Sequence, residues 1–126
     1  MTEISDDALM AEWLALAGVA VYDGFTNAEE VAANFKIPAV DGTIVAALYG
    51  HESYEGSAIV IYVREGKLYE SNGSHCSCNG LEDQWSEEET SVAALRKREW
   101  PSGLESGTAE RMSRLLDMLE AMGKKQ

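Results

Sequence analysis

The residues best suited to chemistry in this chain are two histidines and two cysteines. His75, Cys76 and Cys78 fall within four positions, and His51 is the other histidine. Imidazole and thiolate are common zinc ligands, so these residues could in principle form a tetrahedral site. In an extended chain, however, His75 faces away from the two cysteines, and zinc-binding cysteine pairs usually have a wider spacing. We therefore predict no metal and no cofactor, with a metal-binding module centred on this loop as the alternative.

The same two cysteines are the candidates for redox or nucleophilic chemistry. A disulfide between Cys76 and Cys78 would close a small, strained ring that is easily reduced. A nucleophilic thiol needs a positioned base and positive surroundings, whereas this chain is acidic and raises the pKa of a thiol. We predict that the protein is not an enzyme and has no catalytic residues, and a redox module at this loop belongs to the same alternative.

A second candidate group consists of carboxylates that follow the cysteine loop: Glu82, Asp83, Glu87, Glu88 and Glu89. Paired carboxylates can do acid–base work or bind Mg²⁺, and acids at a helix start also offset the helix dipole. The third reading is a surface that meets a basic protein groove by imitating phosphate charge. We predict that these five residues bind a partner.

The charge distribution supports a basic partner. Residues 1–90 contain 17 acidic and 3 basic residues, a net charge of −14, and residues 91–126 contain 5 acidic and 7 basic residues, a net of +2. Such an acidic field repels nucleic acid and anionic membranes and attracts cationic proteins. We expect no direct binding of nucleic acid or membrane.

Sequence motifs of common enzymes are absent, including the phosphate-binding loop, the nucleophile elbow and the dinucleotide fingerprint. The chain has no apolar run that could span a membrane and no signal peptide pattern, and its two cysteines are too few for a secreted disulfide framework. A cytoplasmic location is therefore expected.

The elements that must position these residues are expected to form one α+β domain over residues 1–126. Apolar periodicity and capping residues predict four helices, at residues 5–17, 27–35, 86–98 and 108–122. Ser86 and Glu89 fit a capping box for the third helix. The last helix has an apolar stripe formed by Met112, Leu115, Leu116, Leu119 and Met122. The stripe predicts a core-facing helix, with a homodimer surface as the alternative.

Runs of β-branched and aromatic residues predict strands at 43–49, 58–63 and 67–71. Glu65 and Gly66 predict a tight hairpin. Residues 50–56 and 71–80 are expected to be exposed loops. The fold predicted is a small antiparallel sheet of three or four strands packed with about four helices, in which the near-continuous apolar strand 58–63 is central and covered on both faces.

The sequence of residues 54–95 resembles that of a group of small uncharacterised bacteriophage and prophage proteins. The shared pattern is the hairpin followed by Gly-Ser-His-Cys-Ser-Cys-x-Gly-Leu-Glu-x-Gln-Trp, which spans Gly73 to Trp85 here. Asn79 stands where the group tends to have an aromatic residue. The resemblance implies a phage context and does not assign an activity.

Small acidic phage proteins often block host machines that have basic nucleic-acid grooves. Combined with the charge, the resemblance predicts a non-catalytic inhibitor of a host defence or nucleic-acid enzyme, of the anti-CRISPR type. Its partner would be a host protein with a basic surface, met in the host cytosol.

Overall fold

The computed structural model describes residues 20–52, 55–75, 81, 84–101 and 103–124. In chain order its elements are β1 (Val21–Asp23), α2 (Ala28–Phe35), β2 (Thr43–Glu52), β3 (Glu55–Arg64), β4 (Lys67–His75), β5 (Glu87–Thr90), α3 (Val92–Arg96) and α4 (Thr108–Lys124). The helix predicted at 5–17 lies outside the described residues.

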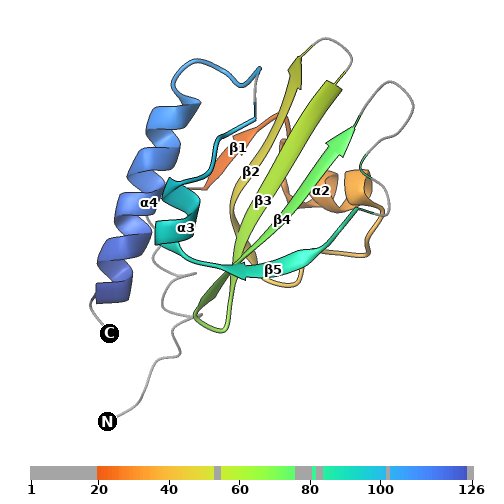
Figure 1. Ribbon diagram of the computed structural model, residues 1–126. Coiled ribbons are helices and arrows are strands. Elements are labelled where there is room, and N and C mark those ends of the chain that lie inside the picture. The colour runs from red at the N-terminus through yellow and green to blue at the C-terminus, as the bar shows by residue number, and fades with distance from the viewer. Residues whose placement is uncertain (1–19, 53–54, 76–80, 82–83, 102, 125–126) are drawn as a thin grey trace.

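The strands form one five-stranded sheet in the order β1-β2-β3-β4-β5 (Figure 1). β1 runs parallel to β2, because α2 connects them as a crossover, and the other neighbours are antiparallel. Glu65 and Gly66 both have positive φ, at 53° and 77°, which is the backbone of a tight hairpin turn between β3 and β4.

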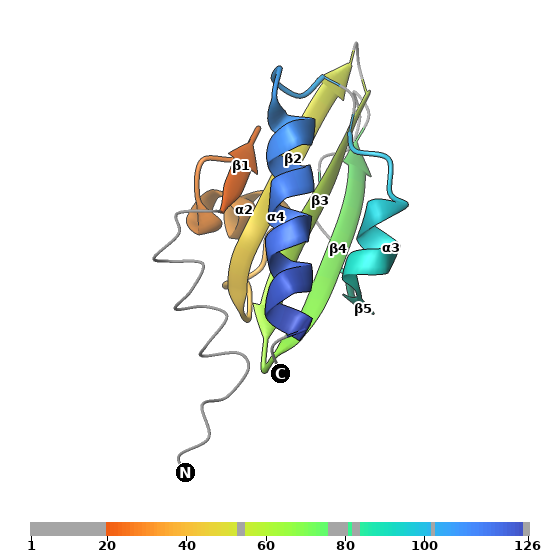
Figure 2. The same cartoon turned by 90° about the vertical axis from the view of Figure 1, so that its left-hand side faces the viewer.

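The sheet lies between helices on its two faces. Figure 2 shows α4 in front of the sheet, with α2 on the far side. Alternate residues of β3 point to the two faces: Ile59, Ile61 and Val63 pack in the cluster with α4, and Ala58, Val60 and Tyr62 in the cluster with α2. These six residues are at most 4% exposed, which confirms the prediction that this strand is central and covered on both faces.

The first four residues of the apolar stripe of α4 face the core, and the fifth, Met122, lies outside the residues whose side chains the structure describes. Met112, Leu115, Leu116 and Leu119 are all buried against β2 and β3, so this stripe stabilises the fold. At the start of the helix, Asp23 of β1 accepts hydrogen bonds from the backbone of Glu105 and the hydroxyl of Thr108, at 2.8 and 2.6 Å. This contact joins the edge strand to the helix that covers the sheet.

The predicted fold class is wrong. The expected sheet of three or four antiparallel strands with about four helices is a mixed sheet of five strands, and the described residues contain three helices. β1 has only three residues, too few for a recognisable alternation, and it pairs with a strand far along the chain. The three predicted strands also extend further, so most of the expected loop at 50–56 belongs to β2 and β3, and β4 runs to His75.

The predicted helix at 86–98 is divided between a strand and a short helix. Residues 87–90 form β5, and α3 begins only after Ser91, whose side chain accepts a hydrogen bond from the backbone of Ala94 at 3.1 Å. The Ser86–Glu89 capping pattern therefore lies in extended chain. Ser86 instead donates its backbone N–H to the Ser71 hydroxyl of β4, at 3.0 Å.

Gly24 offers a direct test of how β1 joins the sheet. Its φ is +84°, and a Cβ there would lie 2.0 Å from the carbonyl oxygen of Tyr49. We predict that Gly24→Ala lowers the free energy of unfolding by ~3 kcal/mol or more, since it combines backbone strain with a clash against backbone.

The matched control is Gly107→Ala. Gly107 has a similar φ of +93° but no atom within 4 Å of an added Cβ. Its substitution should cost about 1 kcal/mol, from the left-handed backbone alone. Urea unfolding of both variants measures the difference, and equal losses would show that β1 does not pack as described.

Candidate functional site

The residues predicted to act are distributed unevenly in the structure. Glu87, Glu88 and Glu89 lie on the edge strand β5. Glu82, Asp83, Cys76 and Cys78 lie outside the described residues, and His75 is the last residue of β4. The site can therefore be built from β5, from the strands beside it and from the end of β4.

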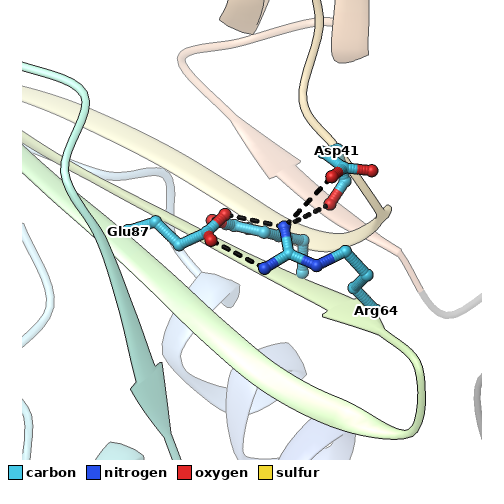
Figure 3. Close-up of polar contacts among 4 residues, drawn as sticks. Asp41, Arg64 and Glu87 are labelled. Atoms are coloured by element: carbon cyan, nitrogen blue, oxygen red, sulfur yellow. Dashed lines mark hydrogen bonds and ion pairs between the residues drawn. The ribbon is translucent and has the colours of Figure 1, made fainter.

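β5 is fixed to the sheet by an ion pair between Glu87 and Arg64 of β3 (Figure 3). The guanidinium donates to both carboxylate oxygens, from Nη1 to Oε2 at 2.8 Å and from Nη2 to Oε1 at 2.7 Å. Such a two-pronged contact is stronger and more directional than a single ion pair. Arg64 also reaches Asp41, before β2, with 3.2 Å to its carbonyl oxygen and 3.4 Å to its carboxylate.

Tyr62 completes this contact from the buried side. Its hydroxyl donates to Glu87 Oε2 at 2.5 Å, although the ring itself is fully buried. We call Asp41, Tyr62, Arg64 and Glu87 the Arg64 cluster. It brings together residues separated by more than 20 positions in sequence, which explains why a local capping pattern did not predict it.

The electrostatics of the Arg64 cluster keep Glu87 charged. Hydrogen bonds from Arg64 and Tyr62 lower the pKa of Glu87 to about 2. Burial, together with the hydrogen bond to Glu87, raises the pKa of Tyr62. A carboxylate with such a low pKa is a poor proton donor or acceptor near pH 7, so the cluster is suited to holding β5 and not to acid–base chemistry.

Aromatic rings extend from the Arg64 cluster across the same face of the sheet. The ring of Tyr62 stacks on Tyr69 and on Trp85, each with centroids 5.7 Å apart. Phe35 of α2 forms a T-shaped pair with Trp85, with centroids 5.1 Å apart. The Arg64 guanidinium carbon lies 4.4 Å from the centre of the Tyr69 ring, a favourable cation–π contact. Trp85 thereby fixes the chain that enters β5.

The strand geometry separates the predicted acidic contact residues. Successive residues of a strand point to opposite faces. Glu87 and Glu89 pair with Ser71 and Tyr69 of β4, on the α2 side, whereas Glu88 pairs with Glu70, on the α4 side. In the predicted helix over residues 86–98, these three residues would instead follow one another around the first turn.

The carboxylates of Glu88 and Glu89 are available for contact with a partner, and that of Glu87 is not. Both residues are exposed, and neither forms an ion pair within the described part of the chain. Glu87 spends both of its oxygens on Arg64 and Tyr62. Of these three residues, only Glu88 and Glu89 therefore have a carboxylate that is free of ion pairs within the described residues.

The basic residues of the C-terminal segment, residues 91–126, form few ion pairs with the acidic residues of segment 1–90. Arg96 pairs with Asp117 and Glu120 of α4, at 2.7 and 3.1 Å, so it compensates acids of its own segment. Among the described residues, only Arg98 of this segment forms an ion pair with an acid from residues 1–90, meeting Glu70 Oε1 at 2.7 Å. Within the described residues, no ion pair is formed by Glu29 and Glu30 of α2, by Glu65 of the β3–β4 turn, or by Glu88 and Glu89 of β5.

Glu70 is a structural carboxylate. It is fully buried, and Asn72 also donates to its Oε1, at 2.8 Å. Burial raises its pKa, but interactions with Thr90, Asn72 and Arg98 outweigh burial and lower the pKa below its ordinary value. Glu70 Oε2 and Thr90 Oγ1 have no hydrogen bond of normal geometry within the described residues.

The end of β4 is held by residues that sequence reasoning did not assign. The backbone N–H of Ser74 donates to Gln84 Oε1 at 2.9 Å, and Gln84 Nε2 donates to the Ser74 carbonyl at 2.6 Å. Beside it, a Cβ on Gly73 would lie 3.0 Å from Leu81 Cδ2 and 3.1 Å from Phe35 Cε1. Gly73, Leu81, Gln84 and Trp85 all belong to the motif of the phage resemblance, which was the one available signal.

No group of three or more histidine, cysteine or acidic residues in the described part of the chain is placed to hold a metal ion. The predicted ligands Cys76 and Cys78 lie outside that part, so the alternative of a metal or redox loop stays a prediction. No described helix has the length and apolarity needed to cross a membrane. Comparisons with protein-family models, with curated proteins and with solved structures gave no match.

The Arg64 cluster predicts an acid-dependent stability. Because the pKa of Glu87 is lower in the folded chain than its ordinary value of 4.5, its contribution is present above pH 4.5 and is lost as pH falls towards 2. We predict that Glu87→Gln lowers the free energy of unfolding near pH 7 by about 0.5–1 kcal/mol, the range for partly exposed ion pairs.

The difference between Glu87→Gln and the wild type should shrink between pH 4.5 and pH 2, as measured by urea unfolding at a series of pH values. Glu89→Gln is the matched control, since Glu89 is on the same strand without an ion pair, and it should change stability little. A gap for Glu87→Gln that stays constant down to pH 2 would contradict the assigned role.

Proposed function

We propose that this protein is a non-catalytic phage or prophage accessory protein that inhibits a host defence or nucleic-acid enzyme, of the anti-CRISPR type, by binding a basic surface on it. The observation that carries the proposal is that Glu29 and Glu30 of α2, Glu65 of the β3–β4 turn, and Glu88 and Glu89 of β5 are without an ion pair among the described residues. The basic residues of the C-terminal segment that form ion pairs in the described structure meet Asp117, Glu120 and the buried Glu70.

The contact would centre on β5. This strand is at the edge of the sheet, so one side of its backbone is unpaired within the described residues. Acidic residues on an edge strand oppose pairing with a second copy of the same chain, because like charges would face each other. A basic segment of a partner meets the opposite situation, since Glu88 and Glu89 attract it.

In this proposal, Glu87 positions β5 for the contact with the partner and does not itself touch the partner. Its ion pair with Arg64 holds β5 against the sheet, and a pre-formed edge costs less ordering entropy on binding than a mobile one. The predicted contact set is thus reduced, among the described residues, to Glu88 and Glu89. Glu82 and Asp83 precede this strand in sequence and stay in the proposal as predicted contacts.

Charge of this kind governs encounter more than tightness. A net charge of −14 over residues 1–90 would steer a cationic partner and repel nucleic acid and anionic lipid. The proposal therefore includes a host protein as the partner, no direct contact with nucleic acid or membrane, and the cytosol of the bacterial host as the location. A homodimer through α4 would have to use residues other than Met112, Leu115, Leu116 and Leu119, since these four are buried.

The proposal predicts a charge-specific capture of a partner from bacterial lysate. The doubly reversed variant Glu88→Lys/Glu89→Lys should lose the captured partner or bind it at least about 10-fold more weakly, since opposite charges become like charges. The control Glu105→Lys/Glu110→Lys changes the net charge equally at exposed positions before and on α4, and it should bind as the wild type does.

Salt separates the electrostatic contact from an apolar one. Raising the ionic strength from about 0.01 to about 1 M shortens the screening length from about 30 to about 3 Å, so capture should fall steeply. Expression of the chain in a strain with CRISPR immunity should raise phage plaquing, and the β5 variant should not. Equal capture by both double variants, unaffected by salt, would contradict the proposal.

A further inference from the structure

The backbone of β4 shows which way each of its residues faces. Ser74 directs both its N–H and its carbonyl group to the side chain of Gln84, at 2.9 and 2.6 Å, and therefore away from β3. Every second residue of a strand repeats this orientation, and β4 pairs with β3 along its whole length without a shift of register. Leu68 and Glu70 accordingly direct their backbone groups away from β3 and towards β5.

The same alternation decides which backbone groups of β5 are available. Glu88 and Thr90 pair with these two residues of β4, so their N–H and carbonyl groups are used inside the sheet. Glu87 and Glu89 alternate with them, so their backbone groups point to the outer side of β5. No described strand lies on that side, since β5 is the last strand of the sheet (Figure 2). The edge therefore offers a donor and an acceptor at both of these residues.

This edge is held in shape from within the molecule. Arg64 and Tyr62 bind the Glu87 carboxylate, and Trp85, which leads into β5, stacks on the Tyr62 ring. A strand that is already extended and fixed loses little freedom when another strand pairs with it. β5 therefore meets the main requirement for strand addition, in which main-chain hydrogen bonds supply affinity and alternate side chains supply specificity.

The exposed side chains of β5 select which strand can be added. Glu88 lies on the α4 side and Glu89 on the α2 side, and neither forms an ion pair within the described residues. Residues of an added strand alternate in the same way, so two successive Lys or Arg residues would meet one carboxylate each. A second copy of β5 would instead place carboxylates opposite carboxylates, which is unfavourable.

We propose that β5 accepts an extended segment of its partner as a further strand of the sheet. The segment forms main-chain hydrogen bonds with Glu87 and Glu89, and it carries two successive basic residues opposite Glu88 and Glu89. This mode of binding rests on the proposed function, which makes the partner a protein with a basic surface. It adds the backbone conformation and the sequence pattern of the segment that is bound.

The direct test uses a synthetic peptide, acetyl-Thr-Val-Lys-Lys-Val-Thr-amide, with the isotopically labelled full chain. Amide hydrogen exchange is followed by NMR at peptide concentrations up to saturation. Exchange of the Glu87 and Glu89 amides should slow by at least about 10-fold, because these N–H groups gain partners. Exchange at Glu88 and Thr90, whose N–H groups already face β4, should change little.

A methylated peptide is the matched control for backbone pairing. Methylation of both main-chain lysine nitrogens keeps the charge of the peptide, but one of these nitrogens must face β5 in either orientation. The methylated peptide should therefore leave the Glu87 and Glu89 amides unprotected. This control needs no change in the protein, so it is independent of how any variant folds.

Two substitutions at one position separate backbone from charge in the protein. Glu89→Gln removes the carboxylate and keeps the N–H, whereas Glu89→Pro removes both. Edge strands tolerate proline where the N–H faces outward, so the fold should survive. We expect Glu89→Pro to bind the peptide at least about 10-fold more weakly than Glu89→Gln does, because a main-chain hydrogen bond is lost.

Strand addition is overturned if the Glu87 and Glu89 amides stay unprotected, or if the methylated peptide protects them equally. A wild-type dimer that the peptide dissociates would also overturn it, since a second copy would then occupy the edge. The lysate capture described above tests the proposed function separately. If the captured host protein binds Glu89→Pro and Glu89→Gln equally, the contact uses side chains only and strand addition alone fails. If the peptide pairs with β5 but no host protein is captured, strand addition is supported and the proposed function fails.

Discussion

The constraint on which this structure depends is the register of β2, β3 and β4. β3 is apolar along both of its faces because α4 covers one and α2 the other, and every second residue is committed to a different core cluster. A shift of one residue would move Tyr62 into the α4 cluster and Ile61 into the α2 cluster, and it would misplace all of their neighbours. The closely packed interior therefore admits one alignment, and that alignment decides which polar residues share a face at the ends of the strands.

The polar residues that matter lie where the core ends. At one end of β3, Arg64 gathers Glu87 and Asp41 and fastens the edge strand β5. At the other end, beyond the residues of β4 that pair with β5, Gln84 forms two hydrogen bonds with the backbone of Ser74. Trp85, next to Gln84 in sequence, stacks on Tyr62 of the Arg64 cluster, so the segment that follows the cysteine loop is tied to both ends. The proposed function concerns the first of these ends, where the edge strand β5 would meet a basic partner.

Sequence reasoning succeeded where structure is dictated locally. The apolar run of β3, the Glu65–Gly66 turn, and the stripes of α2 and α4 all follow from periodicity and turn chemistry. It failed where a distant contact overrides a local pattern. Ser86 and Glu89 fit a capping box, but the bonds of Glu87 to Arg64 and Tyr62 hold this segment as a strand, and β1 is defined mainly by its pairing with β2. For the same reason Glu87 was assigned to a partner although its oxygens are engaged within the chain, and the alignment of His51 with His75 depends on a register that the sequence does not display.

The register itself is the claim to test, and cross-strand NMR contacts in the isotopically labelled full chain measure it directly. The account predicts backbone nuclear Overhauser effects between His51 and Gly56 and between Gly56 and His75, together with those of the Tyr49, Ala58 and Gly73 row behind them. It also predicts contacts between Glu70 and Glu88, with extended-chain chemical shifts over 87–90. Contacts displaced by one residue along β3, or helical shifts across 87–90, would contradict it.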